Sequence, residues 1–151
     1  MKNKKAATIL HAIMSIIMGI FFIYKGYGKL TSDTLKPVEL TNIVVTNIES
    51  GSYEPPVAYN IVMNTFKYSG FLDMISIIQI ITGILIITPV TRLIGLLLLL
   101  PIIFNIFFMH VFFDNRIDEN IETGILLLIN IILCFYYQKD LFKFLLRKQA
   151  L

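Results

Sequence analysis

Four polar side chains lie at similar depth inside long apolar stretches of the chain: Ser15, Gln79, Asn105 and Asn130. A polar group in the hydrocarbon core of a membrane is costly, so each needs a partner or a function. Each lies eight to ten residues from the end of its stretch that is expected on the outer side of the membrane. The four are therefore predicted to form one inward-facing polar layer, which either contacts a ligand or joins the helices through hydrogen bonds.

A second group of residues, whose side chains can ionise, lies nearer to the expected outer ends of the apolar stretches. It contains the acids Asp73 and Glu122, the imidazole of His110, and the cations Lys25 and Lys29. His110 closes one stretch and Glu122 opens the next, so the two are predicted to approach each other, with Asp73 nearby. Together they would move a proton or bind a polar head group. The alternative is a set of charges solvated at the membrane surface.

These two groups supply all the candidate ligand-binding residues, and none is assigned a catalytic or metal-binding role. The candidates are Ser15, Lys25, Asp73, Gln79, Asn105, His110, Glu122 and Asn130. The sequence has no HExxH, CxxC, Walker or GxGxxG motif. The one cysteine, Cys134, cannot form an internal disulfide.

The elements that position these residues are membrane-spanning helices. The 151 residues are 56% hydrophobic and only 15% charged, against about 25% charged in soluble domains. A spanning helix needs about 20 mostly apolar residues. Four stretches satisfy this: 6–24, 69–88, 93–113 and 121–138. We therefore predict one all-α domain over residues 1–151, an integral membrane four-helix bundle.

The distribution of cations predicts the topology. With the N-terminus inside, eight cations lie on the inner side and five on the outer side. The inner set is Lys2, Lys4, Lys5, Arg92, Lys139, Lys143, Arg147 and Lys148, and the outer set is Lys25, Lys29, Lys36, Lys67 and Arg116. Both termini are therefore expected in the cytoplasm. Because the cations flank apolar stretches, the lipid bilayer and not nucleic acid is the expected partner.

A long outer loop, residues 25–68, is predicted between the first two helices. The segment 38–48 is rich in Val, Ile and Thr and favours a short strand or hairpin. The segment 57–67 favours a short helix at the membrane surface. A structured loop of this length is either a functional cap or a passive connector. In the third helix, Pro101 is expected to introduce a kink, on nearly the same face as Asn105.

From Val62 onward the chain resembles the DoxX family of small four-helix membrane proteins. The resemblance rests on Ser69-Gly70-Phe71-Leu72, Gln79, Thr82-Gly83-Ile84-Leu85, Leu97–Pro101, Ile102-Ile103-Phe104-Asn105-Ile106, Met109-His110-Val111-Phe112, Leu126–Asn130 and Phe135-Tyr136-Tyr137, with Tyr24–Leu30 at the exit of the first helix. This chain has Gln79 where many relatives carry Glu, which removes a proton-carrying role at that position. The resemblance implies a membrane location and links to quinone-dependent redox chemistry and complex assembly.

Three functions follow as expectations. The first is an accessory or assembly subunit of a membrane redox complex, without catalysis of its own, that associates with a membrane protein partner or with further copies of itself. The second is a component of a quinone-linked oxidoreductase that holds a small apolar ligand, with quinone as the possible cofactor. The third is a carrier of a small solute or lipid that uses the polar layer.

Overall fold

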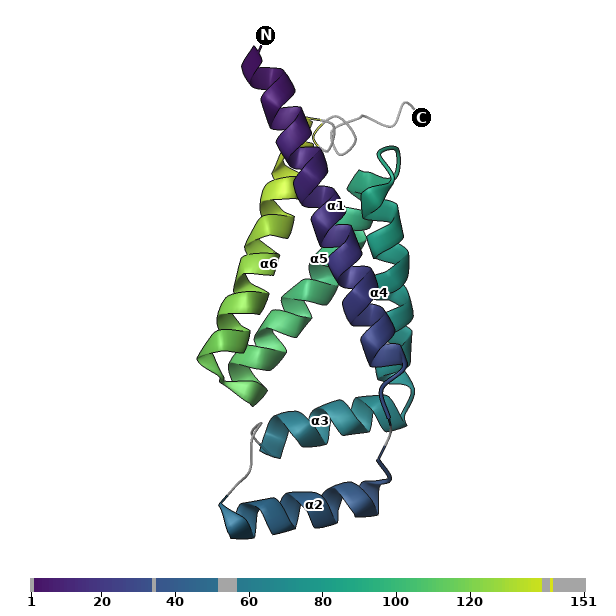
Figure 1. The fold of residues 1–151 in the computed structure, drawn as a ribbon, viewed down its shortest axis with the longest axis vertical. Helices are drawn as coiled ribbons and strands as arrows, with labels where there is room; N and C mark the ends of the chain where they lie inside the picture. The colour runs from purple at the N-terminus through teal and green to yellow at the C-terminus, as the bar shows by residue number, and fades with distance from the viewer. Residues whose placement is uncertain (1, 34, 52–56, 140–141, 143–151) are drawn as a thin grey trace, which may run out of the picture.

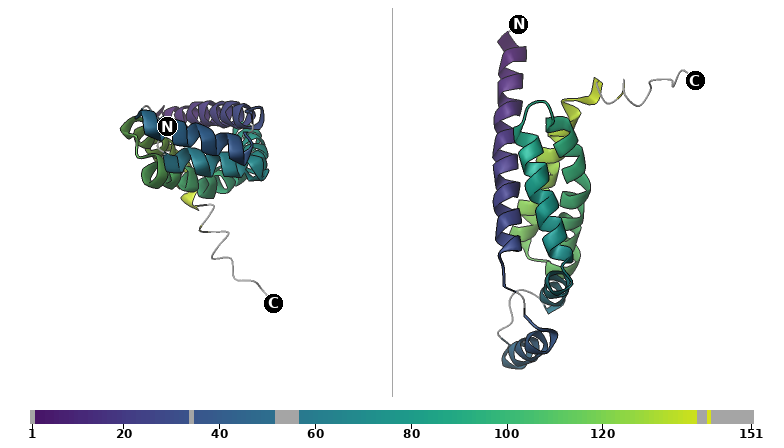
Figure 2. Two further views of the ribbon diagram at one scale, coloured as in Figure 1. Left: turned by 90° about the horizontal axis from the view of Figure 1, so that it is seen from below. Right: turned by 90° about the vertical axis from the view of Figure 1, so that its right-hand side faces the viewer.

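The computed structural model describes residues 2–33, 35–51, 57–139 and 142. Within them the secondary structure is entirely helical, as predicted (Figure 1). The helices are α1 (Lys2–Leu30), α2 (Pro37–Ser50), α3 (Val57–Tyr68), α4 (Phe71–Ile87), α5 (Arg92–Met109) and α6 (Ile117–Phe135). A π-helix, η1 (His110–Asp114), extends α5. The long helices α1, α4, α5 and α6 pack against one another, and α2 and α3 cross one end of them (Figures 1 and 2).

Two of the described helices are long and apolar enough to cross a membrane. They are α1, over residues 5–30, and α5 with its π-helical end, over residues 92–114. The pair α3 and α4 becomes a third candidate if its 82° bend is treated as a break within one span. Helix α6 is not among these candidates, and it carries Asp118, Glu119 and Glu122 near its start.

The closest helix contact joins α1 to α4 through glycines. A Cβ atom added at Gly83 would lie 2.6 Å from the Gly19 carbonyl oxygen, and one added at Gly19 would lie 2.7 Å from the Gly83 carbonyl oxygen. Nearer to α3, a Cβ atom at Gly26 would lie 2.8 Å from the Ser76 carbonyl oxygen. Small residues therefore let the two backbones touch over several turns, and this contact fixes where the lysines of α1 lie against α4.

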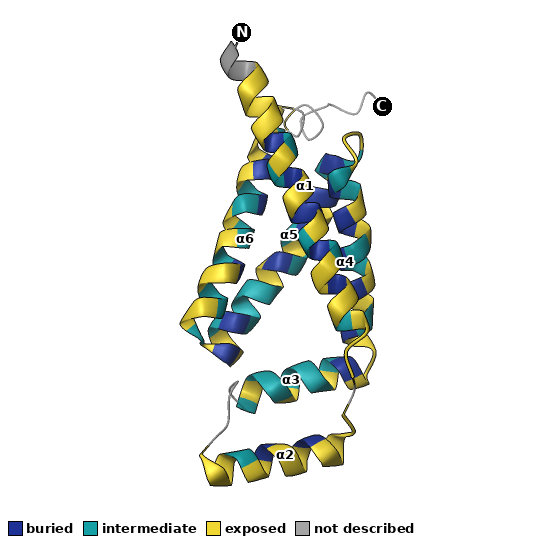
Figure 3. Ribbon diagram, in the orientation of Figure 1, coloured by how far each residue is buried: buried dark blue, intermediate teal, exposed yellow. Residues whose placement is uncertain are grey.

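Apolar side chains occupy both the interior and the outer surface of the helices. The interior cluster is Met18, Phe22, Ile86, Leu96, Leu99, Ile103, Leu133 and Cys134. Many large apolar side chains face outward, among them Ile17, Ile84, Ile94 and Leu128, each more than half exposed. Figure 3 shows this exposed surface along α1, α4 and α6. Such a surface is suited to a lipid solvent, because helices in membranes need no polar outer face.

The predicted strand at 38–48 is wrong, because α2 covers the whole segment. Pro37 starts the helix at a position where its missing N–H costs nothing, and the Glu39 carboxylate accepts a hydrogen bond from the Lys36 backbone N–H at 3.2 Å. Gly51 ends the helix with a positive φ of 67°. These end signals outweigh the β-branched composition. The helix predicted at 57–67 is confirmed as α3, and its place at the membrane surface stays a prediction.

The other helix boundaries differ from the predicted ones mainly at the end of the long helices where α3 lies. Helix α1 continues to Leu30, six residues beyond the expected end at Tyr24, so Lys25 and Lys29 stand on a helix and not in a loop. Helix α6 begins at Ile117, four residues before the expected start. At the opposite end the His11 ring stacks on Tyr136 with centroids 4.1 Å apart. The start of α1 and the end of α6 therefore lie together.

Candidate functional site

A polar cavity of about 220 Å³ lies between α1, α4, α5 and α6 where α3 crosses them. We call it the lysine cavity. It is lined by Phe21, Phe22, Lys25, Lys29, Tyr59, Gln79, Ile103, Ile106, His110, Glu119, Glu122, Thr123 and Leu126. Four residues predicted from the sequence thus meet in one place: Lys25, Gln79, His110 and Glu122. Their role in ligand binding stays a prediction.

Helix α1 contributes two cations, one turn apart. The Lys25 ammonium forms an ion pair with the Glu122 carboxylate at 3.2 Å, and both side chains are nearly half exposed. The Lys29 ammonium donates a hydrogen bond to Gln79 Oε1 at 3.3 Å. A carboxylate thus balances Lys25, whereas Lys29 contacts only a neutral amide. An exposed ion pair stabilises a fold by at most about 1 kcal/mol, so the Lys25–Glu122 pair is replaceable by a ligand.

Gln79 is the most deeply buried polar residue of the lysine cavity, with 1% of its surface exposed. Its Oε1 accepts from Lys29, but its Nε2 has no hydrogen-bond partner among the described residues. A buried donor left without an acceptor costs about 1–3 kcal/mol. The amide therefore keeps, in the wall of the lysine cavity, an N–H group without an acceptor among the described residues.

The end of α5 holds His110 in a fixed orientation. The buried Asp114 carboxylate contacts His110 Nδ1 at 2.8 Å. Arg116 donates to the same carboxylate through Nε at 2.6 Å and through its terminal nitrogen at 2.9 Å. That hydrogen bond raises the pKa of the Arg116 guanidinium above its ordinary value. An ionised carboxylate only accepts, so Nδ1 donates, and Nε2 is the ring nitrogen left for a ligand.

Helix α3 covers the lysine cavity with Tyr59. Its ring lies 5.1 Å from the His110 ring, centroid to centroid. Burial, together with the charges of Asp114 and Glu119, raises the pKa of Tyr59 to about 12, so the phenol stays protonated at neutral pH. Because Tyr59 belongs to the segment 25–68 and lines the lysine cavity, the structure favours a functional cap over a passive connector for this segment.

A lysine fastens this cap to the end of α1. The buried Lys67 ammonium donates to the Lys29 and Leu30 carbonyl oxygens, each at 3.0 Å, and forms an ion pair with Asp73. The last carbonyl groups of a helix lack partners within the helix, so a cation there is stabilising. Lys67 thus joins α1, α3 and α4 beside the lysine cavity.

Neither of two predicted proximities is seen as a direct contact between the described side chains. Asp73 does not line the lysine cavity, because its carboxylate pairs with Lys67 at the α3–α4 corner. His110 and Glu122 both line the cavity but are not paired: His110 contacts Asp114, and Glu122 contacts Lys25. The short loop between the two helices puts His110 and Glu122 at similar depth. The direction in which each side chain points from its helix then determines its partner. Glu122 faces α1, and the π-helical turn brings Asp114 under the imidazole.

Of the predicted polar layer, three members are buried and one is not. Ser15 and Asn130 are fully buried, but neither lines the lysine cavity. The Ser15 hydroxyl donates to the His11 carbonyl oxygen at 2.7 Å, and Asn130 Nδ2 donates to the Leu96 carbonyl oxygen at 3.3 Å. The Ser15 bond stays within α1, the Asn130 bond joins α6 to α5, and Asn130 Oδ1 has no partner among the described residues. Asn105 is exposed, which contradicts its predicted inward position.

The orientation of Asn105 follows from the face that α5 buries. That face contains Leu96, Leu99 and Ile103, and Asn105 lies two residues beyond Ile103, about 200° around the helix. Its Nδ2 donates to the Pro101 carbonyl oxygen at 2.8 Å, so both residues share one face, as predicted. Because α5 is apolar on every side, its sequence does not indicate which face is buried.

Two further cavities follow one another from the lysine cavity toward α4. An apolar groove of about 430 Å³ runs between α4 and α5, which we call the α4–α5 groove; it is lined by Phe66, Phe71, Met74, Ile75, Ile78, Pro101, Ile102, Asn105, Ile106 and Met109. Between it and the lysine cavity lies a small cavity of about 60 Å³. Together they connect the interior to the outer surface of the helices.

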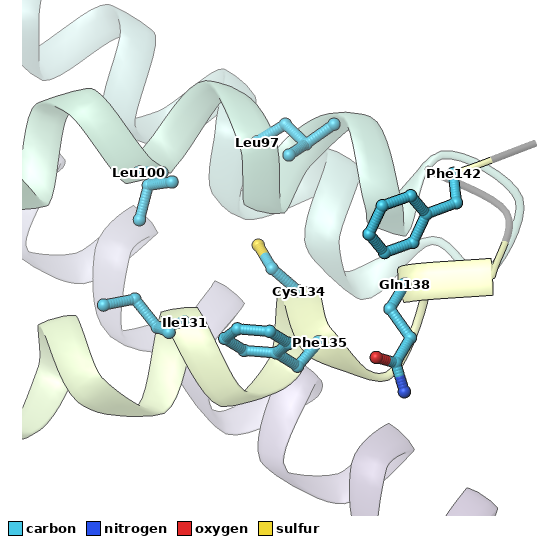
Figure 4. A pocket seen from close by; sticks show the side chains of 7 residues that line it. All are labelled: Leu97, Leu100, Ile131, Cys134, Phe135, Gln138 and Phe142. Carbon is cyan, nitrogen blue, oxygen red and sulfur yellow. The ribbon is translucent and has the colours of Figure 1, made fainter. Parts of the chain in front are cut away.

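A separate apolar pocket of about 310 Å³ lies at the opposite end, between α5 and α6. Figure 4 shows the Cys134 side chain directed toward Leu97 and Leu100, while the Gln138 amide points away from the pocket. None of its described lining residues is charged, so we do not count it as a functional site.

Sequence reasoning left Tyr59, Asp114 and Arg116 out of the site, and it named Lys29 without placing it on a helix. Asp114 lies four residues after His110, a spacing that puts two side chains on one helical face. Extending the third helix by one turn would have revealed this pair. Tyr59 gave no signal, because its position depends on the path of α2 and α3.

Comparison with models of protein families, with curated proteins and with solved structures found no match for this chain. The resemblance to the DoxX family therefore stays a prediction from the sequence.

Proposed function

We propose that the chain is a multi-pass protein of a bacterial cytoplasmic membrane, in which α1, α4, α5 and α6 cross the bilayer as a four-helix bundle. Helix α6 has 19 residues, about 28 Å at 1.5 Å per residue, slightly less than a hydrocarbon core of about 30 Å. Its acidic residues lie in its first six positions, so keeping them at the membrane surface leaves 13 residues, about 20 Å, for the core, and α6 crosses where the bilayer thins around it. The contacts between the start of α1 and the end of α6 support placing these two ends on one side of the membrane, and the distribution of cations favours the cytoplasmic side.

Within this bundle, we propose that the lysine cavity holds a small ligand at the outer side of the membrane. One observation carries this proposal: the Gln79 amide is 1% exposed, and its Nε2 lacks an acceptor among the described residues. Protein interiors rarely leave such a donor unsatisfied, so a bound group that accepts its hydrogen bond would explain it. The cap formed by α3 supports the same function.

Of the three functions expected from the sequence, the two that hold a ligand agree best with this cavity: the carrier and the quinone-linked component. A carrier uses Lys29, Gln79 and His110 to bind a polar group without changing it. The role of accessory or assembly subunit, in a complex or a homo-oligomer, stays a prediction. Its partner surface is not indicated by the contacts described above.

A cavity-filling variant tests the ligand. Leu126 lines the lysine cavity, whereas Leu128 on the same helix is 57% exposed at the outer surface. The wild type and the variants Leu126→Trp and Leu128→Trp are purified from membranes in a mild detergent and examined by native mass spectrometry. We expect a bound small molecule on the wild type and on Leu128→Trp, and none on Leu126→Trp. Equal occupancy of both variants, or no bound molecule on the wild type, would contradict the proposal.

A further inference from the structure

Three cavities lie next to one another between the interior of the helices and the surface of α4 and α5. The lysine cavity and the small cavity share four lining residues: Lys29, Tyr59, Ile106 and His110. The small cavity and the α4–α5 groove also share four: Phe66, Ile75, Ile106 and Met109. Ile106 lines all three. The polar interior and the apolar groove are therefore neighbouring compartments on either side of one flexible side chain.

The polar compartment presents donors to its contents. Gln79 Nε2 lacks an acceptor among the described residues, and the Lys29 ammonium lies against the same amide, 3.3 Å from its Oε1. Tyr59 adds a protonated phenol at the cap. A ligand that contacts Gln79 and Lys29 together must offer a hydrogen-bond acceptor at that point, and a ligand with only apolar atoms would leave both unsatisfied.

The surroundings of the Lys29 ammonium favour an acceptor that is an anion. Glu122 pairs with Lys25, and Arg116 pairs with Asp114 and lies 3.6 Å from Glu119. No carboxylate of the described part of the chain lies within 4.0 Å of the Lys29 ammonium. Lys29 is thus a half-buried cation without a counterion, next to a second cation. A bound carboxylate or phosphate supplies the missing charge.

The volume of the lysine cavity indicates whether it encloses a whole ligand or only the head group of one. The lysine cavity, at about 220 Å³, is smaller than the 300–1,000 Å³ usual for pockets that enclose a drug-sized molecule. The α4–α5 groove is larger, at about 430 Å³, and its walls are almost entirely apolar. This division suits an amphiphile with a small polar head and one long tail.

From these observations we infer that the protein binds a single-chain anionic amphiphile. Its carboxylate or phosphate head contacts Lys29 and Gln79 in the lysine cavity, and its tail lies in the α4–α5 groove. This inference rests on the proposed ligand-binding function and specifies the class of ligand. The shared chemistry is an oxyanion, whether it comes from a lipid-like molecule or from a free ion in solution.

The test measures binding to purified protein in nanodiscs of phosphatidylcholine, by isothermal titration. The probes are palmitate, hexadecyl phosphate, the uncharged hexadecanol, inorganic phosphate and a menaquinone. We expect palmitate and hexadecyl phosphate to bind at least tenfold more tightly than hexadecanol. Charge-assisted hydrogen bonds of this kind correspond to roughly 10- to 100-fold in affinity, so Lys29→Met should weaken both anions by that factor. Gln79→Leu should also weaken both.

Matched variants separate the site from the overall charge and from folding. Lys36→Met removes an exposed cation on the same side of the molecule and should leave binding unchanged. Lys29→Arg keeps the charge and should retain most of the affinity, which shows that a loss in Lys29→Met is not a failure to fold. Ile106→Trp fills the passage between the compartments and should weaken palmitate binding.

Any other result of the binding experiment would overturn a specific part of the inference. Hexadecanol binding as tightly as palmitate, or anion binding unaffected by Lys29→Met, would refute the anionic head group. Inorganic phosphate binding as tightly as hexadecyl phosphate would refute the amphiphile and leave a free anion. Binding of menaquinone without palmitate would refute the anionic class while the ligand-binding function stands. No binding of any probe, with no co-purified ligand, would overturn both.

Discussion

The glycine contact between α1 and α4 allows a quantitative prediction for Gly83→Ala. The new methyl group would lie 2.6 Å from the Gly19 carbonyl oxygen and 2.7 Å from Ile23 Cγ1, whereas ordinary contact begins at 3.4 Å, about 0.8 Å further out. Neither neighbour is the far end of a flexible side chain, so the two helices must separate. Overpacking of this kind costs about 1–3 kcal/mol, against a gain of up to about 1 kcal/mol in helix propensity.

We therefore expect Gly83→Ala to lower the free energy of unfolding by about 1–2 kcal/mol. Gly28→Ala is the matched control, because no atom lies within 4 Å of a Cβ added at that helical glycine. It should be neutral or slightly stabilising. The assay is unfolding by sodium dodecyl sulphate in mixed micelles, followed by loss of helical circular dichroism. Equal stability of the two variants would refute the close approach of α1 and α4.

Three further predictions concern the charges and the cap. Arg116→Gln leaves the buried Asp114 carboxylate without its guanidinium and should cost about 1–3 kcal/mol in the same assay, part of which Asp114→Asn in that background recovers. Asp73→Asn should lower stability without changing the affinity for palmitate, because Asp73 pairs with Lys67 outside the lysine cavity; a change in affinity would contradict that placement. In an absorbance titration, the difference between wild type and Tyr59→Phe should contain one phenol that ionises near pH 12; ionisation near pH 10 would contradict its burial.

The sequence predicted the long helices because their signal is strong and local. Twenty apolar residues in succession have few alternatives to a helix in a membrane. The ends were less predictable. Tyr24 was taken as the end of the first helix because charges follow it, yet α1 continues to Leu30, since Lys67 satisfies the carbonyl groups of its last turn. That cation is distant in sequence, so local reasoning could not supply it.

The site was predictable in depth but not in direction. Rise along a helix depends on residue number alone, and Lys25, His110 and Glu122 of one predicted group meet Gln79 of the other in the lysine cavity. Direction requires knowing which face each helix buries. Helix α5 is apolar all around, and so Asn105 was placed inward although it faces outward. The glycines that fix the phase of α1 against α4 give a clear signal only when both helices are seen together.

The central claim is that the lysine cavity holds a ligand against the unsatisfied Gln79 amide. A crystal structure of the protein, purified from its own membrane without added lipid and grown in a lipidic mesophase, tests this most directly. The account predicts density that no protein atom explains within hydrogen-bond distance of Gln79 Nε2 and the Lys29 ammonium. A cavity that holds only water, or one closed by rearranged side chains so that Gln79 Nε2 bonds to the protein itself, would contradict it.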